Sequence, residues 1–214
     1  MSKYVIVDLE MCNVPKTVIR NVYPLRNEII QIGAVVVDES LEITDEFMTY
    51  VRPQYGIIDS YIEELTGISR KDVCGAPCIK DALEMFMSWV PDGAIMVSWS
   101  ESDECQIRKE TEAKGLFIDG LSKYLETWLD CQKTFSEKMD NDRSYKLSEA
   151  LIIANIDYDD GEHDGLVDAK NTAQLFIKME REPELTLNPY LSGQVEETTY
   201  CPLAKLLANY NPAW

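Results

Sequence analysis

The pattern of apolar and β-branched positions predicts that the chain begins with a run of strands. Residues 4–9 (YVIVDL) are apolar at odd and even positions alike, which is typical of a strand buried on both faces. Residues 28–37 and 43–51 predict two more strands, and the short link between them indicates an antiparallel pair. A connection of mixed polar and apolar character follows at 57–72. The first third of the chain therefore predicts a three-stranded antiparallel meander.

The rest of the chain predicts helices that alternate with two further strands. Helices are expected at 79–90, 103–114, 146–156 and about 165–180, and strands at 94–99 and near 126–132. Ser144 is the expected cap of the helix at 146–156. A meander followed by helix, strand, helix, strand and two helices predicts an α/β fold: a mixed five-stranded sheet, with two parallel strands beside the meander, flanked by helices.

Length and composition predict one domain with a tail. We expect a domain over residues 1–182 and a C-terminal extension, 183–214, that packs on or near it. Apolar content of 45% with 27% charged residues is ordinary for a soluble protein. No stretch approaches the roughly 18 apolar residues of a membrane span, and the start, MSKYVIVDLE, does not predict a secretory signal. We therefore expect a cytosolic protein with no membrane partner.

The six cysteines, at 12, 74, 78, 105, 131 and 201, fit a reducing compartment. Several stand within apolar or helical patterns, as buried free thiols do. A structural zinc site is the alternative, but the chain has one histidine and no CxxC pair.

The net charge of −18 argues against broad electrostatic capture of nucleic acid. An acidic chain can still bind a phosphodiester where divalent cations lie between its carboxylates and the substrate. The charge then favours a small active site that binds the end of a strand, with weak affinity for long duplexes. The alternative is that the 38 acidic residues only keep the surface soluble.

Three carboxylates stand at strand ends in this pattern. Asp8 and Glu10 are two residues apart, so on a strand both point to one face. Burying two acids together is unfavourable unless a cation neutralises them, although a strand can also simply end in exposed acids. Asp103 follows the strand at 94–99 and opens a helix, where it is either a helix-capping acid or a third site carboxylate. If the first and fourth strands are parallel neighbours, Asp103 reaches Asp8 and Glu10.

The single histidine, His163, stands five residues before Asp168. Five residues of helix turn by about 500°, which is about 140° off a common face. The two side chains can therefore converge only if His163 lies on a loop and Asp168 on the following helix. Gly161 and Gly165 bracket the histidine and favour such a loop. The alternatives are a solvated loop histidine and a polar helix face.

These residues form three ordered motifs: VDLEMC (7–12), SWSESDECQI (98–107) and HDGLVDAKNTA (163–173). On these motifs the chain resembles the DEDDh 3′–5′ exonucleases, which have an RNase H-like fold. The segments EIIQIGAVV (28–36), LTGI (65–68) and YKLSEAL (145–151) are also similar, most of all to the branch of RNA-end-trimming 3′-exoribonucleases. The resemblance spans about residues 4–180. Met11 and Asp164 depart from residues common in the family, which affects substrate preference and leaves the acids intact.

The resemblance implies hydrolysis with two Mg²⁺ or Mn²⁺ ions held by carboxylate oxygens. The implied metal ligands are Asp8, Glu10, Asp103 and Asp168, with Asp8 bridging the ions and Asp103 acting partly through water. His163 is the implied general base toward the attacking water, a task that suits an imidazole because its ordinary pKa is near 6.5. The implied substrate-binding residues are Met11, Leu65, Thr66, Ile68 and Lys146.

We therefore expect a 3′–5′ exonuclease acting on nucleic acid with a free 3′ end, single-stranded RNA or DNA, with RNA favoured. Candidate contacts for the phosphate track are Arg70, Lys71, Arg143, Lys146 and Lys170, each of which could equally be a solvated charge. One alternative is a proofreading-type DNA exonuclease that works beside a polymerase. Another is a catalytically silent nucleic-acid-binding domain, against which the presence of all five site residues argues. A calcium-binding protein is disfavoured because no DxDxDG loop occurs, and the sequence predicts no oligomeric state.

Overall fold

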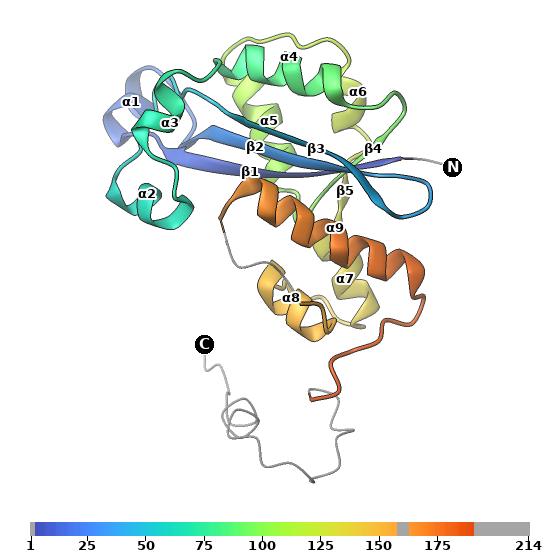
Figure 1. Ribbon diagram of the computed structural model, residues 1–214. Helices are drawn as coiled ribbons and strands as arrows, with labels where there is room; N and C mark the ends of the chain where they lie inside the picture. Colours follow the sequence, from blue (N-terminus) through green and yellow to red (C-terminus); the bar gives the residue numbers. More distant parts are fainter. Residues whose placement is uncertain (1–2, 158–162, 191–214) are drawn as a thin grey trace.

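A five-stranded sheet lies between two layers of helices in the computed structural model, which describes residues 3–157 and 163–190 (Figure 1). The strands are β1 (Tyr4–Asn13), β2 (Asn27–Val37), β3 (Ile43–Tyr50), β4 (Ile95–Ser98) and β5 (Leu129–Asp130). Their order is β3-β2-β1-β4-β5. β1, β2 and β3 form an antiparallel meander, whereas β4 and β5 pair parallel to β1 and to each other. The predicted mixed α/β sheet is confirmed.

The helices divide between the two faces of the sheet. They are α1 (Lys16–Asn21), α2 (Ser60–Thr66), α3 (Arg70–Cys74), α4 (Ile79–Trp89), α5 (Ser102–Ala113), α6 (Leu121–Leu125), α7 (Cys131–Lys138), α8 (Leu147–Ile153) and α9 (Gly165–Arg181). Helices α4, α5 and α6 bury their apolar residues against one face, and α7, α8 and α9 against the other (Figure 1). Helices α2 and α3 cover a third cluster where β1 and β2 meet the loop after β3.

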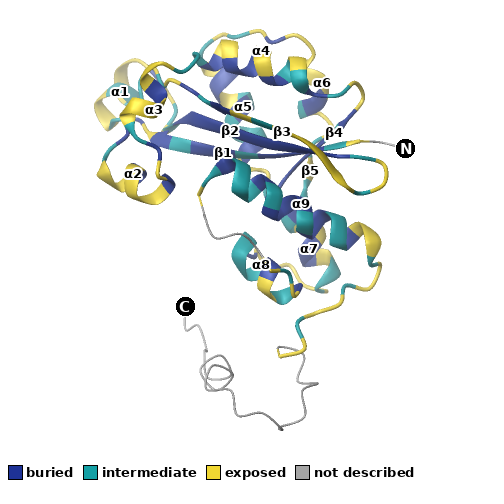
Figure 2. Cartoon of the chain, viewed as in Figure 1, coloured by how far each residue is buried: buried dark blue, intermediate teal, exposed yellow. Residues whose placement is uncertain are grey.

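The two central strands carry the core. Val5, Ile6 and Val7 of β1 are fully buried, with Val5 and Val7 in one apolar cluster and Ile6 in the other. This is the two-sided burial that an uninterrupted apolar run predicts. Side chains of β2 are buried almost throughout, whereas the edge strand β3 is largely exposed (Figure 2). The buried centre of the sheet is therefore the pair β1–β2.

Two local predictions are wrong, and the strand near 126–132 is confirmed but shorter than expected. The segment 57–72 is not a plain connection, because Asp59 caps α2 and Ser69 caps α3 through their side chains. The strand near 126–132 shortens to β5, since Asp130 accepts a hydrogen bond from the backbone N–H of Lys133 and starts α7. Ser144 does not cap α8: the N-cap is Lys146, in an extended conformation and without a side-chain cap bond.

The first residues of the predicted C-terminal extension lie on α8. Leu185 packs against the cluster beneath α7, α8 and α9. The backbone N–H of Asn188 donates to the carbonyl of Ile153 at 2.8 Å, and its side-chain amide donates to the carbonyl of Ile152 at 3.2 Å. The remainder of the extension, 191–214, lies outside the described residues. Across the described residues, no helix combines the length and the apolar character that crossing a bilayer requires.

Candidate active site

The strand β1 places Asp8 and Glu10 on the same face of the sheet. Asp8 pairs with Gly33 of β2 and Glu10 with Gln31, and a β-bulge follows between Glu10 and Met11. Glu10 is only 7% exposed, and Asp8 is partly buried. Two-residue spacing on a regular strand thus sets the two carboxylates side by side, facing α9.

The parallel pairing of β1 and β4 brings Asp103 to the same end of the sheet. Asp103 lies in the first turn of α5, just after β4, and is 5% exposed. β4 pairs with β1 only as far as Ile6, and farther along β1 the carboxylate of Asp103 accepts a hydrogen bond from the backbone N–H of Leu9 at 3.2 Å. Asp103 is therefore held against the strand segment that carries Asp8 and Glu10.

His163 lies on a turn and Asp168 on the first turn of α9, as their five-residue spacing requires. The backbone N–H of His163 donates to Oδ2 of Asp168 at 2.9 Å. His163 has a φ of 71°, a left-handed conformation that is uncommon outside glycine and gathers at functional sites. Ligand atoms of Glu10, His163 and Asp168 all lie within 4.8 Å of one another.

A close backbone contact places the start of α9 on the sheet. A Cβ atom on Gly33 of β2 would lie 2.1 Å from the carbonyl carbon of Gly165, so only glycine fits. Beside this contact, Oε1 of Gln31 accepts a hydrogen bond from the backbone N–H of Gly165 at 2.8 Å. Asp164, a departure from the family pattern, is the N-cap of α9 through its side chain. These contacts position Asp168 close to Glu10.

Burial and mutual repulsion make the carboxylates hard to ionise together. Burial, then Asp103, Asp168 and Glu10, raises the pKa of Asp8 well above its ordinary value. Burial, then Asp168 and Asp103, raises the pKa of Glu10 to about 8. Burial raises the pKa of Asp103 to about 7, against the lowering effect of the Leu9 hydrogen bond. A set of oxygen donors that repel one another in this way fits hard divalent cations, which would neutralise them.

A cavity of about 520 Å³ opens beside His163 and Asp168. Its other lining residues are Trp99, Gln132, Ser144, Tyr145, Lys146, Leu147 and Ser148. The carbonyl of Tyr145 accepts hydrogen bonds from the side chains of Trp99 (3.2 Å) and Gln132 (2.7 Å), which fixes the wall of the cavity. The exposed Lys146 therefore shares a cavity with the histidine.

The segment predicted to hold the terminal nucleotide is mostly internal. The hydroxyl of Thr66 donates to the carbonyl of Ile62 at 2.9 Å and accepts from the backbone N–H of Ile68 at 3.1 Å. Thr66 and Ile68 are buried, whereas Leu65 is 36% exposed. Met11 is partly buried against the cluster beneath α4, α5 and α6. Among the side chains of this segment, Leu65 is therefore better placed than Thr66 or Ile68 to touch a nucleotide.

Several of the predicted phosphate contacts are already engaged within the protein. Lys170 pairs with Glu46 at 2.8 Å, and Arg143 pairs with Glu149 at 2.6 Å. The guanidinium of Arg70 donates to the carbonyl of Ile58 at 2.9 Å. Lys71 is exposed. Lys170, Arg143 and Arg70 are thus less available to bind phosphate than a cation without a partner in the protein.

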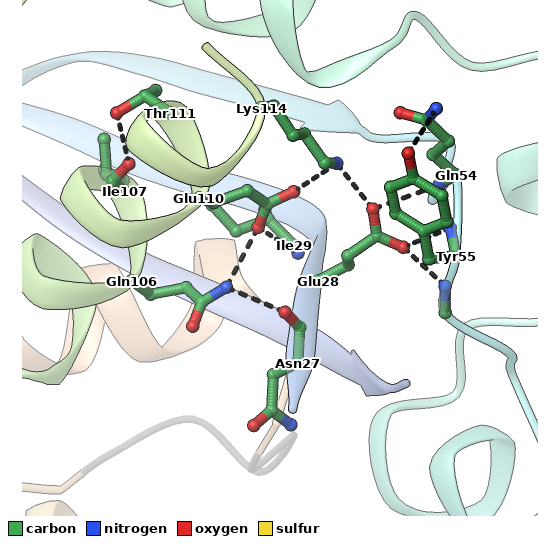
Figure 3. A network of polar contacts seen from close by, with 11 residues as sticks. Asn27, Glu28, Ile29, Gln54, Tyr55, Gln106, Ile107, Glu110, Thr111 and Lys114 are labelled. Carbon is green, nitrogen blue, oxygen red and sulfur yellow. Dashed lines mark hydrogen bonds and ion pairs between the residues drawn. The ribbon is translucent and has the colours of Figure 1, made fainter. Parts of the chain in front are cut away.

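A buried polar network, which the sequence did not reveal, holds the loop that leads to α2 (Figure 3). Glu28 of β2 is fully buried, and its carboxylate accepts hydrogen bonds from the backbone N–H groups of Gln54, Tyr55 and Gly56. Lys114 bridges Glu28 and Glu110, at 2.5 and 2.8 Å. The signal for this network was Glu28, a charged residue in a largely apolar strand pattern, but it did not specify partners.

A match to a protein-family model shows which family this chain belongs to. A family model described as Exonuclease matches residues 5–176. The chain belongs to this exonuclease family. Over 183 residues it is 31% identical to ERI1 exoribonuclease 2 of Xenopus laevis, with 71% of this chain aligned to 25% of that protein. Over 156 residues it is 31% identical to the DNA polymerase III subunit epsilon of Aquifex aeolicus, with 72% of each chain aligned.

Other exonuclease relatives share only a domain with this chain. It spans 10% of the PolC-type DNA polymerase III of Caldanaerobacter subterraneus, at 30% identity over 72% of this chain. Among solved structures, the nuclease domain of 3′hExo, a DEDDh family member bound to rAMP, aligns with a TM-score of 0.73 and 24% identity, covering 87% of this chain and 96% of that one. This likeness confirms the predicted RNase H-like fold.

Proposed function

We propose that this exonuclease-family chain is a metal-dependent 3′–5′ exonuclease that removes nucleotides from single-stranded 3′ ends, with RNA favoured. The observation that carries the proposal is the convergence of Glu10, His163 and Asp168 within 4.8 Å, from three places in the sequence. Asp103, Asp168 and Glu10 all lie close enough to Asp8 to raise its pKa. We assign residues 1–182 to the exonuclease domain and 183–214 to an extension.

The proposed cofactor is a pair of Mg²⁺ or Mn²⁺ ions, and the residues that would hold it are Asp8, Glu10, Asp103 and Asp168. Such a pair stabilises charge on the attacking and leaving oxygens of an in-line displacement. The raised pKa values of Asp8, Glu10 and Asp103 support the fit, since oxygen donors that repel one another favour a bound cation.

His163 is the proposed general base. Its side chain is exposed on a turn beside the carboxylates, where the imidazole can accept a proton from the attacking water. The hydrogen bond from its backbone N–H to Asp168 fixes the turn, so that the imidazole keeps its place relative to the acids. A proton acceptor and a carboxylate cage in one place is what phosphodiester hydrolysis requires.

The proposed substrate grip has two parts. Leu65 and the backbone of Met11 contact the terminal nucleotide, with Thr66 and Ile68 acting through the backbone they support. Lys146, in the cavity next to His163, contacts a neighbouring phosphate. Five cysteines of the described residues are free thiols, which supports a cytosolic location.

A second candidate function is a DNA exonuclease of the proofreading type. The relative that favours it is the epsilon subunit of DNA polymerase III, which matches this chain over 72% of its own length. The exoribonuclease relatives favour RNA. The two candidates share the carboxylate site and differ in which sugar they accept.

The test is digestion of 5′-labelled single strands of RNA and DNA, matched in sequence, with Mg²⁺ and with EDTA. We expect stepwise shortening from the 3′ end, faster for RNA, and no cutting of a circular strand. Asp8→Asn and Asp168→Asn should abolish it, whereas Asp92→Asn, in the exposed turn before β4, is the matched control. Full activity in Asp8→Asn, or cleavage of the circle, contradicts the proposal. Faster digestion of DNA supports the second candidate.

A further inference from the structure

A cationic pocket lies where β1 continues beyond the carboxylates. It has a volume of about 510 Å³ and is lined by Asn13, Val14, Lys16, Ile19, Arg20 and Arg26. Asn13 is the last residue of β1, three positions after Glu10, which is about 10 Å along an extended strand. Helix α1 stands at this end of the sheet (Figure 1). The pocket is therefore near the carboxylate site without including any of its residues.

The charge of this pocket is opposite to that of the chain. The net charge is −18, yet three lining residues are cationic and none is acidic. Within the described residues, the side chains of Lys16, Arg20 and Arg26 form no ion pair and no hydrogen bond. By contrast, Lys114 and Lys170 are neutralised by carboxylates. Three uncompensated cations in one pocket mark a place where an external anion can bind.

Helix α1 has no structural role that explains these cations. None of its residues is buried, so it adds no side chain to the core. Its place is fixed from outside: Pro15 precedes it, and the backbone N–H of Val14 donates to the carbonyl of Arg26 at 2.7 Å. That bond closes the excursion between β1 and β2 and sets Arg26 beside α1. The segment thus presents Lys16, Arg20 and Arg26 together at the surface.

We propose that Lys16, Arg20 and Arg26 bind backbone phosphates of the nucleic acid whose 3′ end occupies the carboxylate site, outside the terminal nucleotide. The proposal rests on the proposed nuclease function, because the occupant is that enzyme's substrate. Arginine guanidinium groups bind phosphate oxygens through two parallel hydrogen bonds, and Lys16 adds a point charge. Cations are needed here because the rest of this acidic chain repels a polyanion, and the carboxylate site itself addresses only the end of the strand.

Binding is tested on the Asp8→Asn protein, which should not cut, with a 5′-fluorescein 20-nucleotide RNA in Mg²⁺ buffer and fluorescence anisotropy as readout. The triple variant K16Q/R20Q/R26Q should bind at least tenfold more weakly. Its plot of log Kd against log salt should flatten by about 2, at about 0.7 for each single-strand phosphate that the variant no longer neutralises. The control K80Q/K109Q/K123Q removes the same charge from exposed positions on α4, α5 and α6. Equal binding by the two triple variants overturns the proposal.

Substrate length supplies a second test in the protein with Asp8 intact. The ratio of kcat/KM for the 20-mer to kcat/KM for a dinucleotide should fall about tenfold in K16Q/R20Q/R26Q and stay near the parent value in the control. An equal loss on both substrates overturns the proposal, since the effect would then act through the carboxylate site. If the parent protein binds the 20-mer but never shortens it, the nuclease function fails and the anisotropy result still decides the pocket.

Discussion

The backbone N–H of Gly165 donates a 2.8 Å hydrogen bond to the side-chain oxygen of Gln31, and this bond joins the first turn of α9 to β2. Gln31 is fully buried and lies opposite Glu10 in the β1–β2 ladder. Asp168 follows Gly165 by less than one helical turn. The hydrogen bond therefore holds Asp168 near Glu10, two carboxylates that are far apart in the sequence.

Replacing Gln31 with leucine should weaken the attachment of the first turn of α9 to β2. The N–H of Gly165 would stay buried without an acceptor, at a cost of about 1–3 kcal/mol in the free energy of unfolding. Because Asp168 would no longer be held beside Glu10, we expect kcat to fall at least tenfold and the Mg²⁺ concentration for half-maximal activity to rise. Titration of activity with Mg²⁺ measures both. Gln54→Leu, an exposed glutamine, is the control, and an unchanged Mg²⁺ requirement in Gln31→Leu would contradict the positioning role.

Stability without metal should decrease as the pH rises. Glu10 has a pKa of about 8 in the folded chain against 4.5 ordinarily, so the folded state holds its proton more tightly than the unfolded state. That contribution is fully present below about pH 4.5 and is lost as the pH rises through about 8. At about 1.4 kcal/mol per pKa unit, a few kcal/mol are at stake. In EDTA, we expect the melting temperature to fall on the order of 5–10 °C between pH 5.5 and 8.5.

Two comparisons assign this pH dependence to the carboxylate cluster. Glu10→Gln should make the curve in EDTA shallower, because an amide does not ionise, while Asp8 and Asp103 retain part of the pH dependence. Adding Mg²⁺ to the unsubstituted protein should raise the melting temperature most at high pH, where the carboxylates are charged. If the melting temperature in EDTA stays constant or rises with pH, ionisation of the carboxylate cluster does not destabilise the folded state.

Local rules of chain geometry were enough to predict much of the site. Strand parity alone places Asp8 and Glu10 on one face, and the parallel pairing of β1 with β4 carries Asp103 to them. The helical angle between His163 and Asp168 requires the histidine to precede the helix, and α9 begins at Gly165. Each of these steps depends on residues that are near in sequence or on adjacent strands.

What the sequence could not predict depends on contacts between distant segments. The fit of Gly33 against Gly165 and the pairing of Lys114 with Glu28 exist only once α9 and α5 have docked on the sheet. Helix α1 was missed for a different reason: none of its residues is buried, so it carries no apolar periodicity. The strand expected near 126–132 is present as β5, but it is two residues long, too short for the pattern to give its bounds.

His163→Ala should lower kcat by about 10²–10⁴-fold, the usual contribution of a general base. The carboxylates remain, so binding of Mn²⁺ measured by calorimetry should change little. His163→Gln tests whether the proton acceptor or only the bulk of the side chain is needed, and it should be as slow as the alanine variant. An unchanged rate in either variant would assign His163 a structural role.

Lys114→Met should destabilise the fold and weaken substrate binding together. Lys114 is the cation that bridges the buried carboxylates of Glu28 and Glu110, and removing one partner of a buried ion pair costs about 3–5 kcal/mol. Glu28 also holds the loop through the N–H groups of Gln54 and Gly56, and this loop leads into α2. We therefore expect KM for a short oligonucleotide to rise severalfold with a smaller change in kcat, once activity is measured well below the melting temperature.

The charge itself can be separated from the packing of Lys114. In Lys114→Met with Glu28→Gln and Glu110→Gln, no buried charge is left unpaired, so urea unfolding should recover much of the lost stability. The new amide at position 28 keeps one carbonyl oxygen for the loop, and KM should recover only in part. Lys109→Met, exposed on the same helix, is the control and should leave both quantities unchanged. If the triple variant is no more stable than Lys114→Met, the network acts through packing and not through its charges.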